Sequence, residues 1–253
     1  MLKKRVIPIL LYKDGRLVKG SNFQNYRETG MPQSAVRIYS SQDADELFII
    51  NISDSSDTKE DFEFLIELAA QECQVPVCAG GGIKNIEEIR RLIRKGADKV
   101  LINSQNYVNY DLIKKSVRLF GSQAITAGVD FRKIGEQYVL FSDKGKKLES
   151  IMVKEHVKNL QDSMVGELFF NSIDKDGLMS GYDLKILDEI ENEIHVPLII
   201  GGGAGNFEHL ESALRNKSVS GVACGSLFNF GDNNPIRARS YLKNHEIPVR
   251  KLK

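Results

Sequence analysis

Two stretches of this chain carry the same three motifs in the same order. Glu46-Leu47-Phe48, Val75-Pro76 and Gly80-Gly81-Gly82 recur as Glu167-Leu168-Phe169, Val196-Pro197 and Gly201-Gly202-Gly203. Each motif of the second set begins 121 residues after its counterpart (46 and 167, 75 and 196, 80 and 201). Three matches in one register, with no gap, indicate that a half-domain was duplicated.

Around these motifs, eight short apolar runs alternate with segments of helical apolar spacing. The runs cover residues 5–11, 46–52, 75–80, 98–103, 123–130, 166–172, 196–201 and 219–225. Continuous apolarity predicts parallel strands that are buried on both faces. The helical spacing is clearest in residues 85–95 and 183–194. Eight strand–helix units with right-handed crossovers predict a single (β/α)₈ barrel domain over residues 1–253, built from two duplicated half-barrels.

Two segments interrupt this alternation. Residues 13–31 form a long polar connection after the first strand, at the end of the barrel where active sites sit, and we expect a mobile lid there. Residues 131–147 alternate apolar and polar side chains before Asp143-Lys144-Gly145, which predicts a small hairpin after the fifth strand. That hairpin is either functional or a decoration of the rim.

Composition excludes several classes of partner. The 35 Lys and Arg residues nearly cancel the 34 Asp and Glu residues, so no global field favours nucleic acid or a membrane surface. No apolar run approaches the ~18 residues of a membrane span. The three cysteines form no C-x-x-C pair and are expected to be reduced. We therefore expect a cytoplasmic protein with no nucleic-acid or membrane partner, no metal ion and no cofactor.

The repeated glycine triplets are the first chemical signal. Each follows a strand and is expected to open a helix, where backbone N–H groups attract an anion and the missing Cβ lets a phosphate approach. The same phosphate position is common after the last two strands of this fold. The sequence thus predicts two phosphate sites on opposite sides of one barrel mouth, for a ligand with a phosphate at each end. Their residues are Gly81, Gly82, Asn103 and Ser104 in one half, and Gly202, Gly203, Gly225 and Ser226 in the other.

Motifs along almost the whole chain resemble the cyclase subunit of imidazole glycerol phosphate synthase. They include residues 5–8 (RVIP), 13–20 (KDGRLVKG), 79–83 (AGGGI), 96–103 (GADKVLIN), 120–123 (FGSQ), 174–177 (DKDG), 180–183 (SGYD), 201–205 (GGGAG) and 247–250 (IPVR). The resemblance implies a barrel that binds a bisphosphate. It also implies a glutaminase subunit that docks on the bottom of the barrel and supplies ammonia, which passes through the barrel to the active site at the top.

The resemblance also implies which residues do the chemistry. The family uses two aspartates as a general acid/base pair, at the ends of the first and fifth strands. Here the second is present as Asp130, but Leu11 stands at the first position and cannot carry a proton. Lys19 and Asp176 are retained as catalytic candidates. Further departures lie at the same mouth: Asn51 replaces an aspartate, Asn171 a threonine and Gly201 a serine.

A second set of matched positions lies at the opposite end of the barrel. The family has a ring of charged residues there that gates the ammonia path, and the corresponding residues are Arg5, Glu46, Lys99 and Glu167. Two cations and two anions near the axis would compensate one another after partial burial. The resemblance therefore implies a retained ammonia gate.

A retained gate combined with a lost carboxylate leaves three functions open. The chain most resembles paralogues that accompany a glutaminase and an ATP-dependent amidotransferase in bacterial surface-polysaccharide pathways, where an N-acetyl group on a sugar becomes an acetamidino group. The alternatives are a cyclase of histidine biosynthesis that tolerates Leu11, and a non-catalytic scaffold that activates the docked glutaminase.

Overall fold

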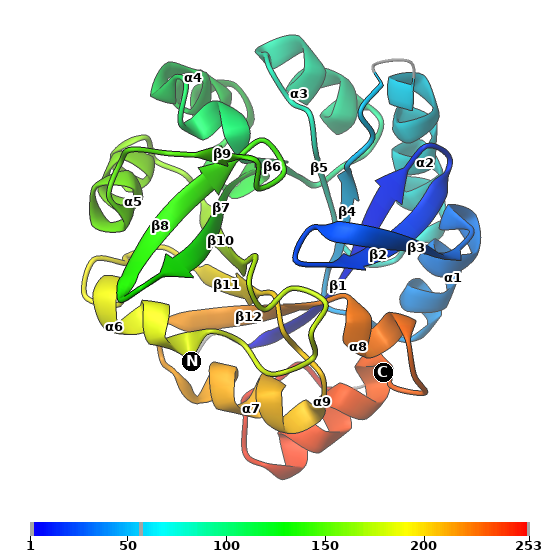
Figure 1. Cartoon of the computed structure of the whole chain (residues 1–253). Helices are drawn as coiled ribbons and strands as arrows, with labels where there is room; N and C mark the ends of the chain where they lie inside the picture. Colours follow the sequence, from blue (N-terminus) through cyan, green and yellow to red (C-terminus); the bar gives the residue numbers. More distant parts are fainter. Residues whose placement is uncertain (1–2, 56–57, 252–253) are drawn as a thin grey trace.

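The computed structural model describes residues 3–55 and 58–251 and has a closed parallel barrel at its centre (Figure 1). Around the barrel the order of the strands is β1, β4, β5, β6, β7, β10, β11 and β12, and pairing of β10 with β7 and of β12 with β1 closes it. The strands are β1 (Arg5–Lys13), β4 (Leu47–Asn51), β5 (Val77–Gly80), β6 (Lys99–Ile102), β7 (Ile125–Ile134), β10 (Glu167–Ser172), β11 (Leu198–Gly201) and β12 (Val219–Cys224). The (β/α)₈ prediction is confirmed, and each predicted apolar run forms a strand.

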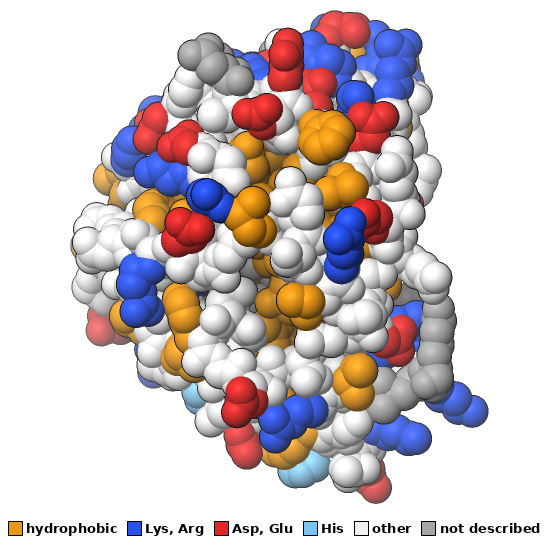
Figure 2. Space-filling model, turned by 90° about the vertical axis from the view of Figure 1, so that its right-hand side faces the viewer, with side chains coloured by type: hydrophobic (Ala, Val, Ile, Leu, Met, Phe, Trp, Pro, Cys, Tyr) orange, Lys and Arg blue, Asp and Glu red, His pale blue; other side chains and the backbone are white. Residues whose placement is uncertain are grey.

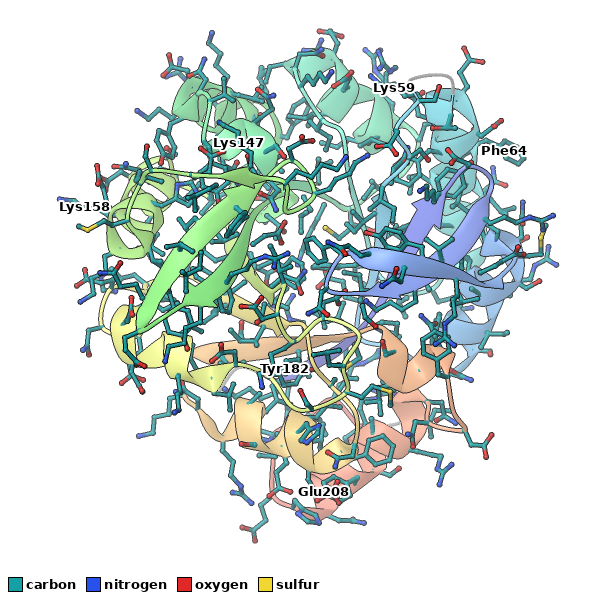
Figure 3. The ribbon with its side chains drawn as sticks, viewed as in Figure 1. Lys59, Phe64, Lys147, Lys158, Tyr182 and Glu208 are labelled. Carbon is teal, nitrogen blue, oxygen red and sulfur yellow. The ribbon has the colours of Figure 1, made fainter. Side chains whose placement is uncertain are left out.

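Helices surround the barrel and cover its outer face (Figure 1). They are α1 (Pro32–Ser41), α2 (Lys59–Glu72), α3 (Ile86–Arg94), α4 (Tyr110–Phe120), α5 (Val153–Asp162), α6 (Leu187–Ile190), α7 (Phe207–Arg215), α8 (Ser226–Asn229) and α9 (Pro235–Asn244). Short 3₁₀ turns in the described part of the chain include η2 (Ser104–Asn106), η3 (Ser122–Ala124) and η4 (Leu184–Ile186). Apolar side chains fill the space between strands and helices, while charged ones such as Lys158 and Glu208 point outward (Figure 3).

The duplication is visible in the pairing of the strands. Ile50 pairs with Gly80 in the first half, and Asn171 pairs with Gly201 in the second, which are the same two positions 121 residues later. The repeat extends to the helix caps. Asn85 accepts a hydrogen bond from the Glu88 amide, and Asn206 accepts one from the amide of His209, again 121 residues on. The two halves therefore share both sheet register and cap chemistry.

The helix predicted over residues 183–194 is shorter than expected. It consists of the 3₁₀ turn η4 followed by α6, which ends at Ile190. Its first turn holds Asp188 and Glu189, Glu191 follows, and the last turn contains no basic residue. Negative charge at the carboxyl end opposes the helix dipole, so the apolar spacing alone does not extend the helix.

Residues 13–31, for which we expected a long polar connection acting as a mobile lid, form regular structure, and their mobility stays a prediction. The segment forms an antiparallel hairpin of β2 (Arg16–Ser21) and β3 (Gln24–Gly30), and β2 also pairs with the end of β1. Asp14 and Gly15 have positive φ angles of 48° and 86°, which is the conformation of a two-residue hairpin turn. The predicted hairpin after the fifth strand is confirmed, because β8 (Gln137–Ser142) pairs antiparallel with β7 and leads into β9 (Lys147–Leu148).

The outer surface mixes charges of both signs. Ion pairs join neighbouring helices, such as Arg37–Glu72 between α1 and α2 and Arg91–Glu63 between α3 and α2. The face that carries α1 and α2 accordingly shows Lys and Arg interspersed with Asp and Glu (Figure 2). Among the described residues, no helix combines the length and apolarity that crossing a membrane requires.

Candidate functional site

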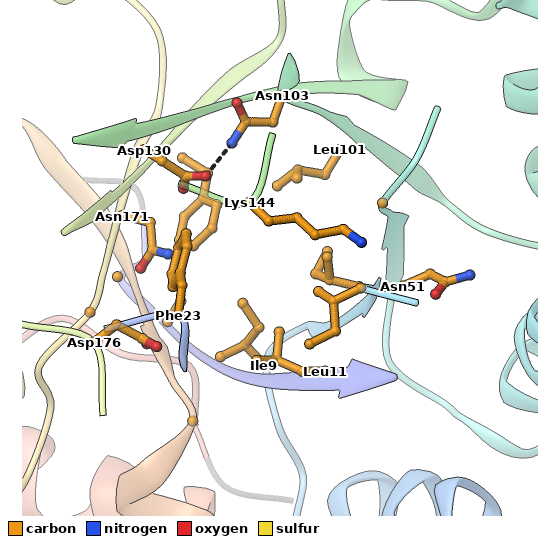
Figure 4. A pocket seen from close by; sticks show the side chains of 18 of the residues that line it. Ile9, Leu11, Phe23, Asn51, Leu101, Asn103, Asp130, Lys144, Asn171 and Asp176 are labelled. Carbon is orange, nitrogen blue, oxygen red and sulfur yellow. Dashed lines mark hydrogen bonds between the residues drawn. The ribbon is translucent and has the colours of Figure 1, made fainter. Parts of the chain in front are cut away.

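A cavity of about 340 Å³ lies at the carboxyl ends of the barrel strands (Figure 4). Leu11 of β1, Asn51 of β4, Asp130 of β7, Asn171 of β10 and Gly201 of β11 all line it. Residues of these five strands thus converge on one space, as is usual for the ligand site of this fold. The sequence placed these residues at one mouth, and the structure brings them together there.

The cavity has an apolar side and a polar side. Ile9, Leu11 and Leu101 form the apolar side, and Asp130, Asn171 and Asp176 lie across from them (Figure 4). Leu11 lines the cavity as its place on the strand predicts, because alternate residues of β1 face the barrel axis. The first strand therefore presents a hydrocarbon surface to any ligand.

Asp130 is the most perturbed acid of the cavity. It is 8% exposed, and burial raises the pKa of its carboxyl to about 7, although side-chain hydrogen bonds from Asn103 and Asn171 act in the opposite direction. Asn103 Nδ2 donates to Asp130 Oδ2 over 2.7 Å. A carboxyl with a pKa near 7 exchanges protons readily at neutral pH, which suits a general acid or base.

Lys19 and Asp176 form a buried ion pair beside Asp130. Lys19 Nζ lies 2.7 and 2.6 Å from the two carboxylate oxygens of Asp176. Burial raises the pKa of the Asp176 carboxyl, and the Lys19 ammonium opposes that rise. Because Lys19 comes from β2, the hairpin and the loop after β10 are joined at the cavity wall.

The two hairpins roof the cavity and supply residues that the sequence analysis missed. Phe23 and Tyr26 of the first hairpin line the cavity. Lys144, just after β8, also lines it and donates to the Ser53 carbonyl oxygen over 2.9 Å and to Asp54 Oδ1 over 2.7 Å. The Asp14-Gly15 pair signals the turn between β1 and β2, whereas the polar, exposed residues around Phe23 and Tyr26 give no such signal.

Both predicted phosphate sites border this cavity. Gly81 and Gly202 have φ angles of 100° and 82°. A Cβ on Gly81 would lie 1.9 Å from the Asn51 carbonyl oxygen, and a Cβ on Gly202 would lie 2.4 Å from the Ser172 carbonyl oxygen. Only glycine fits such positions. The expectation that the triplets open helices needs correction, since α3 and α7 begin beyond their Asn caps. The first glycine of each triplet ends a strand, and the other two lie in the loop that follows it.

The serines of the two phosphate sites have different environments. Ser104 Oγ accepts a hydrogen bond from the Asp143 amide over 3.0 Å. Ser226 Oγ is buried and has no hydrogen-bond partner among the described residues. Of the remaining predicted residues, Gly82, Gly203 and Gly225 line the cavity as well.

At the opposite end of the barrel the four predicted charges form a closed ring. Arg5 pairs with Glu46 over 2.6 Å and also with Glu167, while Lys99 Nζ lies 3.0 Å from a carboxylate oxygen of each glutamate. Burial raises the pKa of Glu46, and Lys99 and Arg5 act against that rise. Each buried anion has two cationic neighbours, which offsets the cost of removing it from water.

An apolar layer separates this ring from the cavity. It contains Ile7, Phe48, Cys78, Leu101, Phe169, Ile199 and Ala223. The rings of Phe48 and Phe169 meet edge to face at 5.4 Å. The barrel interior is thus charged at one end, apolar in the middle and polar at the mouth.

Comparison with known proteins places the chain in a family. The model of the histidine biosynthesis protein family matches residues 5–234. Subunits named imidazole glycerol phosphate synthase subunit HisF are 35% identical in Chlorobium phaeobacteroides and 36% identical in Streptococcus mutans, each over 99% of this chain and 100% of the relative. A Leptospira interrogans protein, to which the same name is given provisionally, is 39% identical to this chain. The match covers 90% of this chain and 91% of that protein. The chain therefore belongs to the histidine biosynthesis protein family, as a HisF-like (β/α)₈ barrel.

Proposed function

We propose that this chain is the synthase subunit of a glutamine amidotransferase complex. A partner glutaminase docks at the end of the barrel that carries the charged ring, and ammonia passes along the axis to the cavity at the other end. The closed ring of Arg5, Glu46, Lys99 and Glu167 is the observation that carries this proposal. Ammonia is small and neutral, so an apolar interior conducts it at lower cost than it conducts an ion.

In this proposal the cavity holds a phosphorylated small molecule and Asp130 moves a proton. Lys19 and Asp176 complete the catalytic set as a buried pair that contacts the ligand from the polar side. The glycine loops with Asn103, Ser104, Gly225 and Ser226 bind phosphate. No metal ion or cofactor is required, because proton transfer is work that side chains carry out themselves.

Leu11 directs the proposal toward a reaction other than ring closure. A cyclase of this kind moves protons on two sides of its substrate, and the apolar side of this cavity has no carboxyl in the position of Leu11. We therefore assign the relayed ammonia to the acetamidino modification of a surface-polysaccharide sugar, together with an ATP-dependent amidotransferase. The second candidate is the cyclase subunit of imidazole glycerol phosphate synthase in histidine biosynthesis, which the names of the relatives support.

A gene deletion separates these two candidates. If the proposal holds, the deletion strain grows without histidine, and mass spectrometry finds an acetamido group where the wild-type polysaccharide carries an acetamidino group. Histidine auxotrophy with an unchanged polysaccharide would assign the chain to the cyclase reaction instead. Complementation with the wild-type gene controls for effects on neighbouring genes.

The ammonia path is tested in the reconstituted pathway, with the purified barrel, its glutaminase and the ATP-dependent amidotransferase. Lys99→Met removes one cation from the ring, and we expect product formation with glutamine to fall several-fold while the rate with ammonium chloride, which enters from the cavity side, changes less than about twofold. Lys95→Met is the matched control, because Lys95 pairs with Glu67 on the outer surface. Equal losses with glutamine and with ammonium chloride would contradict a conduit through the ring.

A further inference from the structure

Asp130 lies in a row of three residues on neighbouring strands. Asn171 of β10 is the register partner of Asp130 on β7 and also of Gly201 on β11. The side chain of Asn171 is 8% exposed and therefore nearly as enclosed as a core residue. Asn103, which follows β6, reaches Asp130 from the opposite side. The carboxyl thus lies between two amide side chains, one from each neighbouring strand.

Gly201 is required by the space around it and not by its backbone. Its φ angle lies outside the left-handed region, so a residue with a side chain could adopt its conformation. A Cβ at this position would lie 2.6 and 2.8 Å from atoms of the Phe169 ring and 2.9 Å from Asn171 Oδ1. Real Cβ atoms do not approach other atoms this closely, so any larger residue at position 201 must displace one of these two side chains.

Asn171 is the side chain that would give way. The Phe169 ring is fixed in the barrel interior by its edge-to-face contact with Phe48 and by the rest of the apolar layer. Asn171 Oδ1 also lies 3.1 Å from the position of a Cβ on Gly202, so the amide oxygen is on the glycine side. The Asn171 side chain acts on its register partner Asp130 by lowering the pKa of that carboxyl.

We propose that Asn171 is a positioning residue, which together with Asn103 fixes the Asp130 carboxyl at the cavity wall, and that Gly201 provides the space in which the Asn171 amide stands. The two departures from the cyclase pattern at positions 171 and 201 are then a single coupled change. The inference rests on the proposed function only because Asp130 moves a proton in that function. The coupling between positions 171 and 201 affects the Asp130 carboxyl whichever reaction the barrel serves.

The titration of Asp130 in the intact barrel tests this coupling. Carbon-13 labelling of the aspartate carboxyls follows the protonation of Asp130 by NMR, and Asp130→Asn assigns its signal. Asn171→Leu keeps the volume but removes the amide donor, and it should raise the apparent pKa of Asp130 by roughly one to two units, the equivalent of one lost hydrogen bond to a charged group. The neighbouring ionisable groups Asp176, Lys19, Tyr26 and Tyr107 are unchanged in this variant.

In the wild-type background, Gly201→Ser should also raise the apparent pKa of Asp130. In the Asn171→Leu background it should raise that pKa little further. Asn171→Thr with Gly201→Ser should fold more stably than Gly201→Ser alone, because threonine lacks the amide oxygen that meets the new side chain. Gly221→Ala, which adds a methyl group elsewhere in the barrel interior, is the matched control and should leave the titration unchanged.

Two results would overturn the inference. The first is an unchanged titration of Asp130 in Asn171→Leu, which would remove Asn171 as a positioning residue. The second is an equal shift by Gly201→Ser with and without Asn171, which would show that Gly201 acts on Asp130 by another route. Failure of the ammonia-path experiment, in contrast, leaves both titration outcomes unaffected.

Discussion

Lys19 Nζ lies within 2.7 Å of both carboxylate oxygens of Asp176, and this pair joins the β2–β3 hairpin to the loop after β10. Asn22, at the tip of the hairpin, adds backbone and side-chain hydrogen bonds to the same loop, at Asp176, Ile173 and Asp174. Besides the pairing of β2 with β1, the hairpin is therefore held over the cavity by one buried ion pair and a short network of hydrogen bonds.

The first prediction concerns this ion pair. Lys19→Met leaves the Asp176 carboxylate buried without its partner, and we expect the free energy of unfolding to fall by about 3–5 kcal/mol in urea titrations. Lys144→Met is the matched control, because its partner Asp54 is largely exposed, and it should cost less than about 0.5 kcal/mol. Equal losses in the two variants would mean that burial does not distinguish the pairs.

A buried histidine predicts how stability depends on pH. His156 of α5 stacks on Tyr107 and shares a 2.7 Å hydrogen bond with the Tyr110 hydroxyl. Burial lowers its pKa from 6.5 to about 4. Below pH 6.5 His156 is protonated in the unfolded chain but stays neutral in the folded chain. The free energy of unfolding should therefore decline between pH 6.5 and pH 4, by up to about 3 kcal/mol.

The measurement is the free energy of unfolding at several pH values in wild type and in His156→Phe, which keeps a ring against Tyr107. The difference in free energy of unfolding between wild type and His156→Phe should change between pH 6.5 and pH 4 and stay constant above pH 6.5. His195→Phe serves as the control, because His195 is exposed. A parallel pH dependence of wild type and His156→Phe would show that His156 has the same pKa in the folded and the unfolded chain.

The sequence could predict the barrel because its signals are strong and local. Continuous apolar runs such as residues 98–103 suit only strands buried on both faces, and the duplicated motifs determined the number of units. The β2–β3 hairpin was missed because residues 24–28 are mostly polar and exposed, so no apolar alternation marks them. The Asn171–Gly201 contact was also out of reach, because it depends on which side chains face each other across strands that are distant in the sequence.

A third prediction concerns the phosphate sites, which differ in their serines. Ser226 Oγ is buried without a partner among the described residues and is free to donate to a phosphate oxygen, so Ser226→Ala should weaken binding of inorganic phosphate about tenfold or more. Titration calorimetry measures this, with Ser122→Ala on the outer surface as the control. Unchanged affinity in Ser226→Ala would leave the backbone amides of the glycine loop as the source of any binding there.

The fourth prediction concerns Leu11. Given glutaminase and the bisphosphate precursor of imidazole glycerol phosphate, the wild-type barrel should turn over at least ~100-fold more slowly than a cyclase with both aspartates, since one general acid or base contributes about 10²–10⁴-fold. Leu11→Asp should recover only part of that rate. The new carboxyl would stand among Ile9, Ile50 and Leu101, and their apolar surface would raise its pKa.

Leu11→Asn separates the carboxyl from the change in shape. It has nearly the volume of aspartate but cannot exchange a proton at neutral pH, so it should give no recovery. Thermal unfolding of the three proteins checks that each is folded at the assay temperature. If the wild-type barrel already turns over at the rate of a normal cyclase, the strand 1 carboxylate is dispensable in this cavity. The relayed ammonia would then be consumed in the cyclase reaction, and the assignment to sugar modification would lose its basis.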